Sequence, residues 1–260
     1  MNVLFFGDVC GKPGRRGLAE ALPRLRDRHR ADLVIANGEN AAGGVGITER
    51  TATELLDAGV DVITTGNHVY RHREVYAFLD SFERIVRPAN YPASNPGRGH
   101  TIVAVGGVRA AVINLSGAVM LKVARSPFVE VDALLDRLAG EFDVAIVDFH
   151  AEVTSEKVAM GWHLDGRLAA VIGTHTHVPT ADARVLPRGT AHISDVGMTG
   201  SRNGVLGARR DQVLESFISQ MPIRFDGAEG DVWVNAAAIE IGDDGSARSI
   251  EQILEPAEGG

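Results

Sequence analysis

The chain has 260 residues, 45% of them hydrophobic, and a formal net charge of −8. This length allows one large domain or two small ones with a sizeable core. The acidic balance argues against a dedicated nucleic-acid binder, which usually carries a basic face. A small phosphorylated substrate stays compatible with it, because bound metal can locally reverse the sign of the field.

Cys10 is the only cysteine, so no intramolecular disulfide can form, and this fits a reducing compartment. The first residues lead directly into an apolar run and lack the basic region and cleavage site of a signal peptide. No apolar run approaches the roughly 18 residues that span a bilayer. We therefore expect a cytoplasmic protein without a membrane segment. A homo-oligomer is compatible with the sequence, although no surface stripe indicates one.

Strands and helices alternate in the first part of the chain. We expect strands at residues 3–7, 33–37 and 61–65 and helices at residues 15–28 and 73–80. Thr48 is a predicted N-cap that opens another helix after a glycine-rich loop at residues 41–47. Beyond an irregular crossover near Arg87, Gly106-Gly107 separates two β-rich runs, which predicts a hairpin of residues 101–105 and 108–114.

The same alternation returns in the second half. We expect helices at residues 129–139, 155–161 and 209–219, strands at residues 144–149, 169–173, 183–186 and 190–194, and a second hairpin at residues 231–254. No internal repeat or low-complexity linker divides the chain. The simplest assembly is one α/β domain, residues 1–260, of two stacked sheets flanked by helices.

Five of the apolar runs end on residues that commonly bind metal ions. Runs of this kind are typical of buried strands, and in open α/β sheets sites form at the carboxyl ends of strands. We expect these tips to meet at one edge of one sheet, with donors enough for two metal ions. The candidate residues are Asp8, Glu39, Asn40, Asn67, His68, His150, His175 and His177.

Several candidates also have a structural interpretation. In an extended segment, His175 and His177 would point toward one ion. In a turn they could bind two ions, and Gly173 would let the backbone bend there. They could also be surface histidines. Asp8 could be a helix N-cap, and so, less readily, could Glu39, because the next helix begins several residues later. Asn67 could be a turn residue, and His150 a packed histidine.

The remaining polar features carry less functional weight. We interpret the other histidines as structural or exposed: His29, His72, His100, His163 and His192. Residues 7–13 resemble a P-loop only superficially, because Pro13 stands where Ser or Thr must bind Mg²⁺. Cys10 is either redox-sensitive or a buried, inert thiol.

The ordered motifs resemble those of the calcineurin-like metallophosphoesterases, and in particular of the YmdB-like family. The chain reads Gly-Asp-Val at 7–9, Asn-Gly-Glu-Asn at 37–40, Gly-Asn-His at 66–68, Asp-Phe-His-Ala-Glu at 148–152 and Gly-Thr-His-Thr-His-Val-Pro-Thr-Ala-Asp at 173–182. Residues 195–200, Asp-Val-Gly-Met-Thr-Gly, fit the same family. Cys10 replaces the usual first-site His of the superfamily, and Asn40 is the expected substitute. Residues 201–203 depart from the pattern.

This resemblance implies a four-layer αββα sandwich, with two mixed β-sheets flanked by helices, and a di-metal site. The ions would be iron or manganese, with zinc or magnesium as alternatives. Glu39 would bridge them, Asp8, Asn40 and His177 would bind one ion, and Asn67, His150 and His175 would bind the other. His68 would be the catalytic proton donor.

The implied activity is phosphodiester hydrolysis of cyclic nucleotides. The family indicates 2′,3′-cyclic nucleotides, with 3′,5′-cyclic AMP as a further substrate, attacked at phosphorus by a metal-bound hydroxide. One alternative is a phosphomonoesterase or protein phosphatase with the same metals. Another is a metal-bound signalling scaffold without catalytic activity. The sequence predicts a small phosphodiester as the partner and no dedicated nucleic-acid surface.

Overall fold

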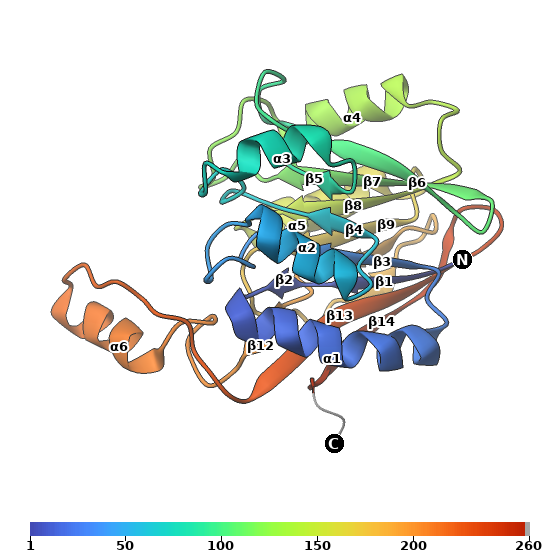
Figure 1. The fold of residues 1–260 in the computed structure, drawn as a ribbon. Coiled ribbons are helices and arrows are strands. Elements are labelled where there is room, and N and C mark those ends of the chain that lie inside the picture. Colours follow the sequence, from blue (N-terminus) through green and yellow to red (C-terminus); the bar gives the residue numbers. More distant parts are fainter. Residues whose placement is uncertain (258–260) are drawn as a thin grey trace.

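The structure is a computed structural model that describes residues 1–257 of the chain. Its helices lie around two β-sheets (Figure 1). They are α1 (Gly11–His29), α2 (Glu49–Asp57), α3 (Val75–Ser81), α4 (Pro127–Arg137), α5 (Thr154–Leu164) and α6 (Arg210–Ser219). Within residues 1–257, every helix is too short or too polar to cross a bilayer.

The larger sheet has eight strands in the order β2-β12-β13-β1-β3-β4-β5, with β14 paired to β13. They are β1 (Asn2–Phe6), β2 (Asp8–Val9), β3 (Leu33–Asn37), β4 (Val62–Thr64), β5 (Ile85–Val86), β12 (Met198–Ser201), β13 (Val232–Ile241) and β14 (Ala247–Pro256). Strands β1, β3, β4 and β5 run parallel, whereas β13 is antiparallel to β1. The carboxyl ends of β1, β3 and β4 therefore meet at one edge.

The smaller sheet has six strands in the order β10-β11-β9-β8-β7-β6. They are β6 (His100–Val105), β7 (Val108–Ser116), β8 (Val144–His150), β9 (Ala170–Thr174), β10 (Arg184–Val185) and β11 (Ala191–Ile193). The four central strands run parallel, and the antiparallel β6 and β10 lie at the edges. Both sheets are thus mixed.

Most of the predicted elements are present with small shifts at their ends. Both hairpins form as predicted, and Thr48 caps α2 in a reciprocal capping box with Thr51. Helix α1 begins at Gly11 instead of Arg15. Pro13 does not delay it, because a residue in the first turn needs no backbone N–H for the helix ladder. Strands β2, β5 and β12 were not predicted; they have only two, two and four residues.

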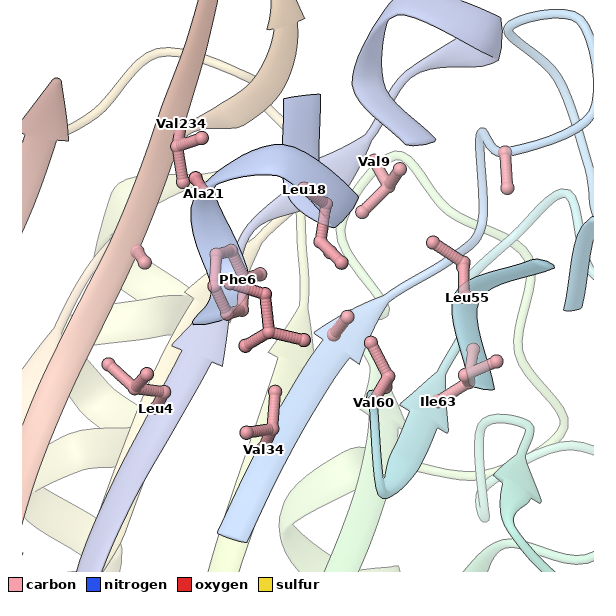
Figure 2. Close-up of a cluster of buried hydrophobic side chains, with 14 of the residues drawn as sticks. Leu4, Phe6, Val9, Leu18, Ala21, Val34, Leu55, Val60, Ile63 and Val234 are labelled. Atoms are coloured by element: carbon pink, nitrogen blue, oxygen red, sulfur yellow. The ribbon is translucent and has the colours of Figure 1, made fainter. Parts of the chain in front are cut away.

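Three apolar clusters hold the layers together. The first packs α1 and α2 against the larger sheet through residues such as Leu18, Leu55 and Phe6 (Figure 2). The second lies between the two sheets, and the third packs α4 and α5 against the smaller sheet. Strand β1 shows how one run serves two clusters: Leu4 and Phe6 belong to the first, and Val3 and Phe5 to the second.

The strand alternation also decides where the strand tips point. On β8, Val144 and Ile146 face the cluster between the sheets, so Asp148 and His150 face the same space because side chains repeat every two residues. The expectation that all five tips lie on one sheet is wrong. Strands β1, β3 and β4 belong to the larger sheet and β8 and β9 to the smaller one, so the tips meet between two sheets.

Gly173 on β9 has a different role from the one expected. The sequence predicts that it lets the backbone bend, but its φ lies outside the left-handed region. A Cβ at this position would instead lie 1.7 Å from the carbonyl oxygen of Ser194. Glycine is therefore required here for the close approach of two chain segments.

We expect Gly173→Ala to lower the free energy of unfolding by roughly 1–3 kcal/mol, since the added methyl group overpacks a buried strand. Denaturant unfolding of the metal-free protein measures this. Gly227→Ala is the matched control, because its Cβ meets nothing within 4 Å and its φ is not left-handed. Equal stability of the two variants would contradict the close-packing explanation.

Candidate metal centre

Three of the predicted ligands converge on the buried ring of a fourth, His150. Its Nε2 atom lies 3.0 Å from Glu39 Oε1, 3.0 Å from Asn67 Oδ1 and 3.0 Å from His175 Nδ1. Glu39, His150 and His175 form a group with the spacing needed to hold a metal ion. Strands from both sheets supply these atoms, since His150 ends β8 and Glu39 and Asn67 follow β3 and β4.

A second group forms around His177. Its Nε2 atom lies 3.0 Å from the side-chain amide of Asn40 and 3.8 Å from Asp8 Oδ1. Oxygen and nitrogen of an amide are assigned from the hydrogen-bond network. Rotation of the Asn40 amide would bring its oxygen to this point and its nitrogen to His68. Glu39 and Asn40 are consecutive, so the two groups adjoin.

A turn after β9 separates the two histidines. His175 and His177 both have left-handed backbones, with φ of 99° and 66°, so the segment is not extended. His175 faces His150, whereas His177 faces Asn40. Of the two arrangements left open by the sequence, the turn that can serve two ions is the one observed.

Two buried carboxylate oxygens at this site need a cation. Among the side chains of residues 1–257, Asp8 Oδ1 and Glu39 Oε1 are buried without a hydrogen-bond partner. Two histidine nitrogens approach Glu39 Oε1 to 3.0 Å, but without hydrogen-bond alignment. Unpaired buried charge is costly, and histidine, amide and carboxylate donors suit several divalent metals. The residues present therefore fit metal ions.

Asp8 is not a helix cap. The N-cap of α1 is Cys10, whose side chain makes no capping bond, and Asp8 Oδ2 instead accepts a hydrogen bond from the backbone N–H of His175 at 3.0 Å. This bond joins the two groups of ligands across the sheets.

His68 lies beside the metal-binding groups and is partly open to solvent. Its Nδ1 atom is 3.0 Å from Glu39 Oε1 and 3.2 Å from Asn40 Oδ1. Its backbone N–H donates to Glu39 Oε2 at 3.0 Å. The ring is 38% exposed, in contrast to the fully buried Glu39, so it is accessible from outside the protein.

Several supporting contacts were not predicted. His150 Nδ1 is 2.9 Å from Thr174 Oγ1, which donates to Asp148 Oδ1 at 2.7 Å. His175 Nε2 is 2.8 Å from Glu152 Oε2, and His177 Nδ1 is 3.1 Å from the carbonyl oxygen of Leu206. Such partners fix the tautomer and orientation of a metal-binding imidazole. Asp148, Glu152 and Thr174 lie within the motifs at residues 148–152 and 173–182, whereas Leu206 lies outside every motif.

Gly66 makes room for the centre. A Cβ at this position would lie 2.2 Å from Glu39 Oε2 and 2.3 Å from His150 Nε2. Any larger residue would therefore displace two of the predicted ligands.

In the metal-free site, neighbouring charges shift the pKa values of Glu39 and His150 in opposite directions. Burial favours neutral forms, but for Glu39 it is outweighed by His150 and His68, which lower the pKa of Glu39. Burial likewise opposes charge on His150, yet Glu39, Asp8 and Asp148 raise the pKa of His150 to about 9. Burial and the positive charge of His150 lower the pKa of His175 to about 3, so His175 is neutral and ready to bind.

Of the other histidines, His72 and His192 contact backbone carbonyls outside the two ligand groups, and Cys10 lies beside one of these groups. His72 Nε2 contacts the carbonyl of Val45 at 2.9 Å, and the buried His192 contacts that of Val171 at 3.2 Å. Cys10 Sγ lies 3.8 Å from His177 Nδ1. Burial, with Asp8 and Glu39 nearby, raises the pKa of the Cys10 thiol, which favours the inert-thiol interpretation.

The sequence and the fold of this chain are similar to those of known proteins. The family described as YmdB-like protein matches residues 4–253. The 2′,3′-cyclic-nucleotide 2′-phosphodiesterase of Bacillus subtilis (strain 168) is 46% identical over 255 residues, covering 98% of this chain and 97% of that protein.

Two solved structures superpose closely. A hypothetical protein from Thermus thermophilus is 43% identical with a TM-score of 0.92, covering 98% of this chain and 100% of that chain. A protein of Mycoplasma pneumoniae described as a novel phosphatase is 33% identical, also with a TM-score of 0.92, covering 98% and 94% of the two chains.

We expect metal uptake by the metal-free protein to release a proton at pH 7–8. His150, with a pKa of about 9, is protonated there and must lose its proton to bind metal. Mn²⁺ affinity should rise roughly tenfold per pH unit until His150 is neutral. Calorimetry in two buffers of different ionisation enthalpy measures the released proton. Binding without proton release would show that His150 is already neutral.

Proposed function

Because the chain belongs to the YmdB-like protein family, we propose that it is a di-metal phosphodiesterase that hydrolyses cyclic nucleotides. The resemblance seen in the sequence motifs is confirmed by the family match over residues 4–253. The observation that carries the proposal is the convergence of two adjoining donor groups on Glu39 and its neighbour Asn40. The relative from B. subtilis supplies the substrate class, 2′,3′-cyclic nucleotides.

In the proposed centre, Glu39 would be shared by two ions. Asp8, Asn40 and His177 would hold one ion, and Asn67, His150 and His175 would hold the other. The short distances within each group and the unpaired oxygens of Asp8 and Glu39 support this division. Iron and manganese are the proposed metals, with zinc or magnesium as alternatives, since imidazole and carboxylate donors accept several metals and availability often decides.

The residues around the centre have distinct proposed tasks. The bound ions would supply a nucleophile near neutral pH and neutralise charge on the phosphate oxygens. His68 would protonate the leaving oxygen as the phosphorus–oxygen bond to the ribose 2′ position breaks. Its Nδ1 atom faces Glu39 and Asn40, which leaves Nε2 for the substrate. The product of a 2′,3′-cyclic nucleotide would then be the 3′-phosphate.

Two other activities stay open to test. A phosphomonoesterase is supported by the relative described as a novel phosphatase, and rates on p-nitrophenyl phosphate against bis(p-nitrophenyl) phosphate distinguish monoester from diester chemistry. 3′,5′-Cyclic AMP is the further diester substrate to compare. A catalytically silent signalling scaffold would bind two metals without hydrolysing either ester.

We also propose that the chain forms one domain with the αββα sandwich of the calcineurin-like superfamily. The three apolar clusters, between helices and sheets and between the sheets, support four layers. Residues 258–260 of the predicted domain lie outside the described residues. Cytoplasmic location stays a prediction. A homo-oligomer also stays a prediction. It is supported by the exposed side chains of Leu214, Phe217 and Ile218 on helix α6, which projects from the rest of the protein (Figure 1).

The first experiment compares hydrolysis of 2′,3′-cyclic AMP by Mn²⁺-loaded protein with that by Glu39→Ala. We expect turnover by the unchanged chain and none by the variant, because the variant lacks the proposed bridge. Metal content is measured on the same samples. Two bound ions without turnover of any diester would contradict the phosphodiesterase. Hydrolysis of p-nitrophenyl phosphate by the same sample would then favour the phosphomonoesterase, and its absence the scaffold.

We expect His68→Ala to lower turnover about 10²–10⁴-fold, the usual contribution of a proton donor, while metal content stays unchanged. His29→Ala is the matched control, since His29 lies in the last turn of α1, at the opposite end of the helix from Cys10. Loss of metal from His68→Ala would instead make His68 a part of the binding site.

A further inference from the structure

A buried ion pair lies behind the turn that carries His175 and His177. Lys157 of α5 donates from Nζ to Asp195 Oδ2 at 2.6 Å, and each side chain is only 1% exposed. Burying such a pair costs about as much free energy as the attraction returns, so it is weak evidence for stability. Its retention in this position calls for another explanation.

The contacts of Asp195 supply one. Its Oδ2 atom also accepts hydrogen bonds from the backbone N–H of Thr176 at 3.0 Å and from Thr176 Oγ1 at 2.7 Å. Thr176 is the residue between the two histidines. At the other end of the same loop, Thr180 donates its N–H to the Asp195 carbonyl at 3.0 Å. Asp195 therefore holds both ends of residues 176–180.

The held turn is a strained one. Left-handed φ is uncommon in residues other than glycine, and strained residues persist where the surroundings over-determine them. Here two such residues, His175 and His177, flank Thr176. The hydrogen bonds from Thr176 to Asp195 fix the middle of the turn, on either side of which the rings of His175 and His177 point in different directions.

We propose that Lys157 and Asp195 are positioning residues for the metal centre: they hold Thr176 so that His175 and His177 face different ions. This inference rests on the proposed metal centre. Lys157 neutralises the buried carboxylate, and the carboxylate fixes the turn. Asp195 also accepts a hydrogen bond from the N–H of Gly197 at 2.8 Å, which places the start of β12 beside β2 and Asp8.

The test measures Mn²⁺ binding by electron paramagnetic resonance, together with thermal unfolding of each metal-free variant. Thr176→Val keeps the shape of the side chain but loses the hydroxyl bond to Asp195. We expect it to weaken Mn²⁺ binding roughly tenfold, the lower end of the range for outer-shell partners of metal ligands. Thr176→Ser keeps the hydroxyl and should bind like the unchanged chain.

Thr190→Val is the matched control. Thr190 is buried, and its hydroxyl donates to the carbonyl of Leu168 at 2.7 Å. It lies just before β11, near the amino end of β9 and therefore away from the metal centre. We expect this variant to lose thermal stability yet to keep the Mn²⁺ affinity of the unchanged chain. A structural role alone would make affinity follow stability in both variants.

Asp195→Asn is the stronger change, since it leaves the ammonium of Lys157 buried without a counter-charge. We expect Mn²⁺ affinity to fall roughly 10–100-fold. If this variant does not fold, Thr176→Val decides. Thr176→Val with unchanged affinity, or Thr190→Val with an equal loss, would overturn the proposal and leave the metal centre intact. An unchanged chain that binds no Mn²⁺ would overturn both.

Discussion

The carboxylate of Asp148 joins the two sheets at the place where their strand tips meet. It is fully buried and accepts hydrogen bonds from Thr64 of β4, from Asn37 Nδ2 of β3 at 2.8 Å and from Thr174 of β9 at 2.7 Å. Burying an unpaired charge would be costly, so these donors must stay close to it. Burial raises the pKa of Asp148 to about 6 in spite of them. The contacts therefore tie the larger sheet to the smaller one.

The geometry of the metal centre follows from these bonds. Asn37 uses its amide nitrogen for Asp148 and its Oδ1 atom for the backbone N–H of Glu39 at 3.1 Å. Thr174 donates to Asp148 and faces His150 Nδ1 at 2.9 Å, which turns Nε2 toward the other ligands. Glu39 and His150, which come from different sheets, are thus positioned by one carboxylate. The polar centre thus lies directly at the end of the apolar layer that packs between the two sheets.

Strand tips could be predicted because buried strands have a clear apolar signature and the ligand types follow them directly. All eight candidate residues lie close together in space. They include Asp8 and His177, the first and the last of the eight along the chain. The assignment of tips to one sheet was wrong because an apolar run does not identify its neighbours. Short strands such as β2 and β12 lack a periodic pattern altogether. Glu152 and the carbonyl of Leu206 depend on the paths of loops, which local sequence does not determine.

The pKa pattern explains how such a centre can form before a metal is present. Glu39 is fully buried, and its lowered pKa keeps it ionised. Its carboxylate is therefore charged but not solvated, and it requires a positive charge nearby. His150, protonated because its pKa is raised to about 9, supplies that charge 3.0 Å away. His175 stays neutral beside it because burial, together with repulsion from the His150 imidazolium, lowers the pKa of His175. In the metal-free site, the proton on His150 thus supplies the positive charge that a bound metal ion would supply.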